Sequence, residues 1–430
     1  MNNPHPAGLK DLVARQIPRR YRAEWLFEKA GLSALVIGLG FLAFFFYTLV
    51  MNGYTAFWQS RIALDVPLTA AVIDPDGTRD VDLISQANYQ GLLRDALRTR
   101  FPEVTARGEL RSLFALLSPG ASFELRDRVR TDPSVIGSTV EFWAVADDDV
   151  DMLIKGHSSR DVPESDRRLS DQQLAWIDAL QADGAVEKRF NRAFFTSGDS
   201  RDPELAGIWS ATVGSFFMLL VTLVLSFPLG VATAIYLEEF AARSRWTDLI
   251  EVNINNLAAV PSIVFGLLGL ALFINLFGMP RSAPLVGGLV LSLMTLPVII
   301  IASRAALTAV PPSIREAALG VGASKMQMVL HHVLPLAMPG MLTGAIIGMA
   351  RALGESAPLL MIGMVAFIVD TPQSPVDPAT ALPVQVYLWA DSPERAFVER
   401  TSAAILVLLV FLLLMNAVAV ILRKRFEQRF

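Results

Sequence analysis

The sequence predicts an all-α polytopic membrane protein of six transmembrane helices, with an inserted α+β domain that lies outside the membrane. Three observations support this fold class. Hydrophobic residues make up 53% of the chain and charged residues only 18%. Six apolar runs reach the length of about 20 residues that a helix needs to cross a hydrocarbon core roughly 30 Å thick. One long polar segment separates the first run from the other five.

The first apolar run, residues 32–51, is predicted to be a retained membrane anchor. Its apolar length exceeds that of a signal-peptide core, and no small-residue cleavage site follows Tyr54. The second and fifth runs are long enough to tilt or bend, and Pro228 predicts a kink in the second. The remaining five runs cover residues 208–237, 257–277, 284–303, 336–368 and 401–422.

The distribution of lysine and arginine predicts the orientation in an inner membrane. Fifteen of these residues fall in the two terminal segments and the loops on one side, and only three fall in the short loops on the other. The positive-inside rule therefore places both termini, residues 1–31 and 423–430, in the cytoplasm. Residues 52–207 are then periplasmic.

The periplasmic segment, residues 52–207, is polar and large enough to bury a core of its own. Alternation predicts strands at 66–73 and 139–146, and Asp74 to Gly77 reads as a turn. Residues 83–99 and 169–195 have helical spacing. His157 is expected at the surface, because no second histidine or cysteine accompanies it as a metal ligand. No chemistry is predicted for this domain.

Several classes of function are excluded by what the chain lacks. There is no cysteine, so disulfides, thiolate catalysis and cysteine metal sites are absent. The net charge is −4 and no aromatic-basic stripe occurs, which argues against nucleic-acid binding. No phosphate-binding loop of the G-x-x-x-x-G-K-[ST] type occurs, so this chain is not expected to bind ATP, and no cofactor or metal is predicted in it.

The cytoplasmic loop between the fourth and fifth runs, residues 304–335, is here called the coupling loop. Ser313 is predicted to cap a short helix, with Glu316 three residues later as in a capping box. Gly320 and Gly322 then interrupt the helix before a second helical stretch. Such a rigid projection is suited to docking on a cytoplasmic partner.

Arg351 and Glu355 are the most informative charged residues, because they lie within the fifth apolar run, four residues apart. A helix places them on one face, within reach of each other. Because an ionisable group at the bilayer centre costs at least about 2.5 to 3.5 kcal/mol, such groups usually face a water-filled path or a protein interior. A guanidinium suits phosphate, and a structural salt bridge is the alternative. Arg304, at the inner end of the fourth run, is either a second pathway residue or a positive-inside anchor.

The coupling loop resembles the EAA loop of ABC importer permeases, whose helix docks into the ATPase subunit. The resemblance rests on Glu316, Ala317 and Ala318, on Gly322, and on Leu334 and Pro335; His332 stands where the pattern usually has isoleucine. Residues 228–239, 260–266 and 350–360 are similar to signatures of phosphate permeases. Across residues 205–430 the chain therefore resembles the PstA family of phosphate permease subunits.

This resemblance implies a MetI-like bundle of a type I ABC importer, with a permease core at residues 208–422. It implies three kinds of partner: a second permease subunit (PstC-like), ATP-binding subunits (PstB-like) that bind ATP and Mg, and a periplasmic phosphate-binding protein (PstS-like). It also associates Arg351 and Glu355 with transport, and the solute with inorganic phosphate.

Other functions remain open at this point. Sulfate or molybdate could replace phosphate, because one arginine does not distinguish tetrahedral anions, and the partner permease could be identical or distinct. A membrane sensor would need a cytoplasmic output domain, whereas only eight residues follow Leu422. A membrane-embedded enzyme would need a nucleophile, base or metal constellation. Neither class explains the coupling loop.

Overall fold

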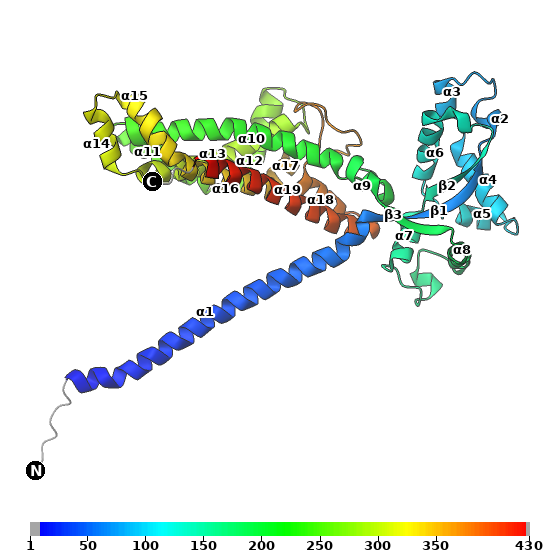
Figure 1. Cartoon of the computed structure of the whole chain (residues 1–430), viewed down its shortest axis with the longest axis horizontal. Coiled ribbons are helices and arrows are strands. Elements are labelled where there is room, and N and C mark those ends of the chain that lie inside the picture. The colour runs from blue at the N-terminus through cyan, green and yellow to red at the C-terminus, as the bar shows by residue number, and fades with distance from the viewer. Residues whose placement is uncertain (1–8, 427–430) are drawn as a thin grey trace, which may run out of the picture. The chain divides into compact units, whose positions relative to one another are not determined.

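The computed structural model describes residues 9–426, which fall into two units divided between Asn52 and Gly53. The first unit consists of one helix, α1 (Leu9–Gly53), which contains the predicted apolar run 32–51 (Figure 1). The predicted cytoplasmic tails lie partly outside the described residues, at positions 1–8 and 427–430.

The second unit begins with a domain, residues 58–190, that is built around a small antiparallel sheet and is here called the α/β domain. Its three strands are β1 (Trp58–Pro67), β2 (Thr139–Val145) and β3 (Val186–Phe190), in the order β2-β1-β3. Arg61 lies opposite both Val145 and Glu187, which sets the register of both strand pairs. The central strand of the sheet, β1, is also the first of the three in the sequence.

One face of this sheet is covered by helices and the other is open. In β1 the side chains of Ser60, Ile62, Leu64 and Val66 are buried, whereas Arg61 is only partly buried and Asp65 is exposed. This period of two is what a sheet with one covered face requires. The covering helices are α2 (Ala70–Ile73), α3 (Val81–Gln86), α4 (Tyr89–Arg100), α5 (Arg107–Phe114), α6 (Gly120–Thr131), α7 (Asp148–Lys155) and α8 (Asp171–Ala182).

Within the α/β domain the predicted strand at 139–146 and the turn at Asp74 to Gly77 are confirmed, but two other predictions are wrong. The predicted strand at 66–73 is the end of β1 followed by α2. Residues 58–65 of β1 were not predicted as strand; at the start of this stretch Gln59 and Ser60 are polar, although both are buried and hydrogen bonded.

The helical stretch predicted at 169–195 is also wrong. It divides into α8, β3 and α9 (Arg192–Thr196), because Gly184 adopts a positive φ of 70° and reverses the chain. The stretch at 83–99 divides into α3 and α4, since the side chain of Asn88 caps α4 by accepting a hydrogen bond from the Gly91 N–H. His157 is exposed, as predicted.

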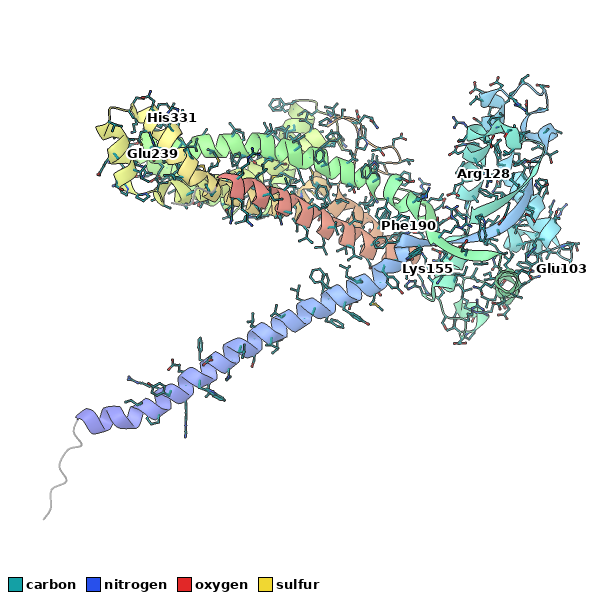
Figure 2. All side chains as sticks on the ribbon, in the orientation of Figure 1. Glu103, Arg128, Lys155, Phe190, Glu239 and His331 are labelled. Carbon is teal, nitrogen blue, oxygen red and sulfur yellow. The ribbon has the colours of Figure 1, made fainter. Side chains whose placement is uncertain are left out.

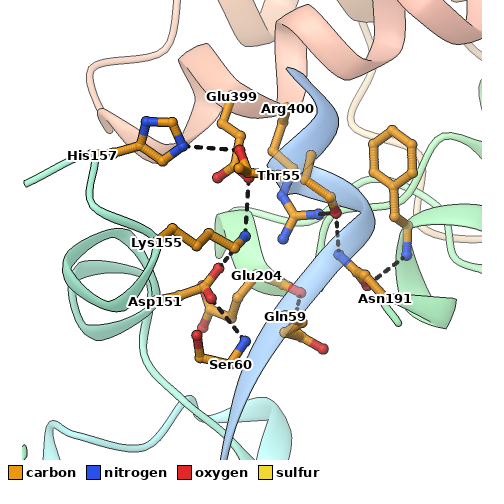
Figure 3. Close-up of polar contacts among 12 residues, drawn as sticks. Thr55, Gln59, Ser60, Asp151, Lys155, His157, Asn191, Glu204, Glu399 and Arg400 are labelled. Carbon is orange, nitrogen blue, oxygen red and sulfur yellow. Dashed lines mark hydrogen bonds and ion pairs between the residues drawn. The ribbon is translucent and has the colours of Figure 1, made fainter. Parts of the chain in front are cut away.

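A buried cluster of charges joins the α/β domain to the last long helix, α19 (Ala396–Phe426) (Figure 3). Lys155 Nζ lies 2.6 Å from Asp151 Oδ2 and 3.0 Å from Glu399 Oε1. The three side chains are 1%, 5% and 3% exposed. Arg400, also buried, donates a hydrogen bond to the carbonyl of Ala56. Two buried cations thus balance two buried carboxylates, as charges removed from water require.

Two further carboxyls near this junction, those of the partly buried Asp147 and the buried Glu204, form no ion pair with any residue that the structure describes. Burial, together with the negative charges of Asp148 and Glu204, raises the pKa of Asp147 to about 8. Burial raises the pKa of Glu204 to about 7, against the opposing effect of a hydrogen bond with Ser118. Each of these groups therefore retains a proton to higher pH than an ordinary carboxyl does.

The rest of the second unit is a bundle of helices. It comprises α10 (Trp209–Ile235), α11 (Arg245–Ala258), α12 (Ser262–Gly269), α13 (Pro284–Thr308), α14 (Pro312–Gly320), α15 (Lys325–Gln327), α16 (Leu334–Gly354), α17 (Ala357–Met361), α18 (Leu382–Ala390) and α19. Three of them continue as π-helical segments, at Tyr236–Phe240, Leu270–Leu276 and Met328–Val333. Five helices of the described chain, α1 included, are long and apolar enough to cross a membrane, or six if the bent pair α11–α12 counts as one span.

Small residues allow the central helices α10, α13 and α16 to pack closely. A Cβ on Gly288 of α13 would lie 2.6 Å from the Val221 side chain of α10. A Cβ on Gly344 of α16 would lie 2.4 Å from the Cβ of Ala302 on α13. Both separations are shorter than van der Waals contact, so these helix crossings require glycine.

Two of the predicted spans are interrupted. The third run, 257–277, bends by 101° between α11 and α12, where Pro261 prevents the helix from continuing. The fifth run, 336–368, is helical only as far as Gly354, and the chain re-enters a short helix at α17 before leaving it again. Hydropathy does not detect such breaks, because the residues on both sides of them are apolar.

We expect Lys155→Met to destabilise the protein by about 3 to 5 kcal/mol, because it leaves Asp151 and Glu399 buried without their cation. Thermal unfolding of the purified full-length protein in detergent measures this change. Lys188→Met, at an exposed position of β3, is the matched control and should leave the melting temperature unchanged. Equal melting temperatures for the two variants would contradict a structural role for the cluster.

The raised pKa of Asp147 predicts that the α/β domain loses stability as the pH rises. The folded state keeps the proton up to about pH 8, whereas an unfolded aspartate loses it near pH 4. The stabilisation is therefore complete below about pH 4 and is lost progressively up to about pH 8. Hydrogen exchange of the α7 amides should speed up between pH 5 and 8, after correction for intrinsic exchange. Asp147→Asn, which keeps the N-cap acceptor, should flatten this dependence, and an unchanged slope would count against it.

Candidate functional site

Arg351 and Glu355 meet at the break that follows α16. Arg351 lies in the last turn of this helix, and Glu355 is the first residue beyond it, with an extended backbone. The Nε of Arg351 lies 3.7 Å from Glu355 Oε1. The expected pair therefore forms, although Glu355 has left the helix. The side chains are 46% and 23% exposed within this chain, so the guanidinium is open to a ligand or a neighbouring subunit.

The break is held in place by α12. A Cβ on Gly266 of α12 would lie 2.7 Å from the Cα of Pro358 in α17, so the two short helices touch backbone to backbone. The side chains of Phe265, Leu353 and Leu359 pack in the same buried apolar cluster. Two interrupted helices thus converge beside Arg351 and Glu355. Interrupted helices surround solute sites in many transporters, because their free backbone groups line a cavity.

Arg304 occupies a different part of the bundle. Its guanidinium lies 2.8 Å from Glu251 of α11 and 3.5 Å from Glu238, which follows α10. Gly348 lies on α16, one turn before Arg351, and contacts Thr295 of α13. Thr295 precedes Arg304 on α13 by nine residues. Arg304 and Arg351 are therefore separated by at least about 14 Å along the bundle. The structure does not bring these two arginines together.

The coupling loop forms a helix, a tight turn and a second helical stretch, as predicted. The first helix is α14, and it begins after Pro311 with Pro312 at its first position. The predicted cap at Ser313 is therefore wrong, because the helix already starts at Pro312, whose fixed φ and missing N–H suit the first position, and Ser313 lies inside the first turn. A capping box does occur, but at Ser324 and Gln327, where the second stretch begins. Gly322 in the turn has a φ of 87°, a conformation that favours glycine.

The predicted docking residues divide between an exposed and a buried side of this loop. Glu316, Ala317 and Gly322 are exposed, whereas Ala318 is only 4% exposed and packs in an apolar cluster with residues of α13 and α16. Leu334 and Pro335 begin α16 and are partly buried. Four large apolar side chains are exposed on the same loop: Leu319, Val321, Met326 and Leu330.

Arg315 attaches α14 to the bundle, a role that the sequence analysis did not assign. Its guanidinium forms two hydrogen bonds with Glu239, of 2.8 and 3.1 Å. It also donates to the carbonyls of Leu307 and Val310 at the end of α13. Glu239 is 76 residues away in sequence and only 7% exposed, so the pairing had no local signal. The coupling loop is thereby fixed to the ends of α10 and α13.

Two family models match parts of the chain. Residues 226–430 match the family model described as "Binding-protein-dependent transport system inner membrane component". Residues 14–164 match a "Domain of unknown function".

Individual proteins are similar to part of the chain. It is 33% identical over 217 residues to "Phosphate transport system permease protein PstA 1" of Mycobacterium tuberculosis, covering 50% of this chain and 70% of that protein. It is 36% identical to "Probable ABC transporter permease protein YqgI" of Bacillus subtilis, but spans only 56% of that protein's length and 39% of its own. A solved structure of the MetNI methionine ABC transporter is similar at 19% identity and a TM-score of 0.42, over 52% of this chain and 95% of that one.

The matched family model and the identity to PstA 1 over more than two thirds of its length show the relationship. The chain therefore belongs to the binding-protein-dependent transport system inner membrane components, in the group that contains the PstA permeases.

Proposed function

We propose that this chain is the translocation subunit of an ATP-binding-cassette importer that carries inorganic phosphate across the inner membrane. The observation that carries this proposal is the Arg351–Glu355 pair at the junction of two interrupted helices. A guanidinium offers paired donors in a planar fork that matches phosphate oxygens. The names of the PstA relatives support phosphate as the solute.

In this proposal Arg351 contacts the anion transiently, and Glu355 limits how long the anion stays. A site that conducts must bind the solute weakly enough to release it. The Glu355 carboxylate lies 3.7 Å from the Arg351 guanidinium. It would therefore compete with a phosphate for the same guanidinium. Arg304 already has two carboxylate partners, which favours the anchoring role over the pathway role.

The coupling loop is proposed to dock on an ATP-binding subunit. Its exposed Glu316, Ala317 and apolar side chains offer a contact surface, and Arg315 transmits a push on α14 to α10 and α13. ATP and Mg would be bound by that partner. A second permease subunit and a periplasmic phosphate-binding protein complete the proposed assembly, as the family implies.

The proposed topology has six spans, with the bent pair α11–α12 as one of them, and with both termini in the cytoplasm. Residues 52–207, which include the α/β domain, would then face the periplasm, and the permease core would occupy residues 208–422. The excess of lysine and arginine on one side supports this orientation.

Replacing the pathway arginine tests the proposed solute. In cells whose only copy of the permease is Arg351→Gln, we expect uptake of labelled phosphate to fall at least about ten-fold, because a charge-assisted contact is lost. Arg281→Gln removes an exposed arginine elsewhere and should leave uptake unchanged. Membrane levels of each variant are measured by immunoblot. If the wild type takes up sulfate or molybdate and not phosphate, the cargo is another oxyanion.

Reversing the charge of Glu316 tests the docking surface. We expect Glu316→Lys to abolish uptake and to lower recovery of the ATP-binding subunit with the purified permease, since an exposed docking residue contacts that subunit. Asp161→Lys makes the same reversal at an exposed position of the α/β domain, and we expect it to leave both readouts unchanged. Normal recovery and normal uptake in Glu316→Lys would remove the argument for coupling through this loop.

A further inference from the structure

A pocket lined almost entirely by arginine lies at the base of the α/β domain. Its volume is about 420 Å³, and it is lined by Arg61 of β1, Arg189 and Phe190 of β3, and Arg192 of α9. Figure 2 labels Phe190, which marks the place where β3 ends and the chain turns toward the helical bundle. No acidic side chain lines this pocket in the described part of the chain.

Two of the three guanidinium groups are held in fixed orientations. Arg61 donates two hydrogen bonds to Glu124, of 2.7 and 2.9 Å, and a third to the carbonyl of Trp143. Arg189 stacks over the ring of Trp143, with its guanidinium 4.0 Å from the ring centroid, and bonds to Glu187. Orientation before binding matters because a ligand then need not immobilise these long side chains.

The third guanidinium leaves the pocket with a net positive charge. Glu124 and Glu187 balance Arg61 and Arg189, but Arg192 forms no ion pair with any residue that the structure describes. The charge of Arg192 is thus the unbalanced one in the pocket, and a bound anion would offset it. Arg189 keeps 41% of its side chain exposed, and its hydrogen bond to Glu187 uses Nε, so its Nη donors are accessible to a ligand. The Nη donors of Arg61 instead bond to Glu124, Trp143 and Gln59, so Arg61 contributes to the wall and the charge of the pocket.

We propose that this pocket binds a phosphate group. Planar guanidinium forks match the tetrahedral oxygens of phosphate better than the single charge of a lysine does. The inference stands on these residues alone and is independent of the solute that the permease core carries. It also gives the α/β domain a ligand.

The position of the pocket allows two sources for that phosphate group. Arg192 begins α9, and the carbonyl of Phe194 in the same helix accepts a hydrogen bond from Ile208, directly before α10. Phe190, which lines the pocket, packs edge to face against Trp58, and the two residues are 52% and 47% exposed. Exposed aromatic residues near helix ends are typical of the membrane surface. The ligand is therefore either inorganic phosphate or the phosphate of a lipid headgroup.

Equilibrium dialysis of labelled inorganic phosphate against the full-length protein in dodecyl maltoside tests the proposal. Every sample carries Arg351→Gln, so that the proposed transport site does not contribute. Adding Arg189→Gln and Arg192→Gln should weaken binding at least about ten-fold, through lost charge-assisted hydrogen bonds. Adding Arg126→Gln and Arg130→Gln, on α6, removes the same number of positive charges away from the pocket and should change nothing. Arg192→Gln alone serves if the double variant does not fold.

A second arm replaces inorganic phosphate with a short-chain phosphatidylglycerol and, as the phosphate-free control, octyl glucoside. Binding of inorganic phosphate that depends on Arg189 and Arg192 identifies the free anion as the ligand. Binding of the lipid alone, with the same dependence, identifies the headgroup. Equal binding by all variants, or equal weakening in the α6 control, would overturn the proposal. None of these outcomes depends on whether the permease transports phosphate.

Discussion

The position of the α/β domain depends on one buried cation. Lys155 lies between a carboxylate of its own helix and Glu399 at the start of α19, with all three side chains almost fully removed from water. A buried cation costs free energy unless its carboxylate partners stay in place beside it. The α/β domain therefore cannot move freely over the end of the bundle. Arg400 completes a neutral set, and burial raises the pKa of Asp147 and of Glu204, so both carboxyls keep a proton to higher pH than an exposed carboxyl does.

The helical bundle combines a fixed end with an interrupted middle. Around the coupling loop, Arg315 and Arg304 bind carboxylates that follow or face α10 and α13, so this end is cross-linked by charge. Near Arg351, by contrast, α11–α12 and α16–α17 are broken and meet through glycine and proline. A displacement applied at the rigid end is therefore best absorbed at the breaks, where no continuous helix resists it.

The sequence predicted those features that depend on composition or on close neighbours. Apolar length located the helices that are long and apolar enough to cross a membrane, and charges inside an apolar run singled out Arg351 and Glu355. The breaks inside two runs were missed because hydropathy reports only how apolar a segment is, and not whether its helix bends or ends. The contacts of Lys155 with Glu399 and of Arg315 with Glu239 span 244 and 76 residues, and no local pattern predicts such pairings. Residues 58–65 of β1 were missed, and at the start of this stretch the buried polar residues Gln59 and Ser60 are bonded to distant groups.

The chain enters the α/β domain at Trp58 and leaves it at Phe190, and these two residues are paired across neighbouring antiparallel strands. Neighbouring strands lie about 4.8 Å apart, so the entire domain is attached through a gap hardly wider than a single tight turn. The segments before Trp58 and after Phe190 can therefore continue next to each other as if the domain were absent, while the ion pair of Lys155 and Glu399 ties the body of the domain to α19.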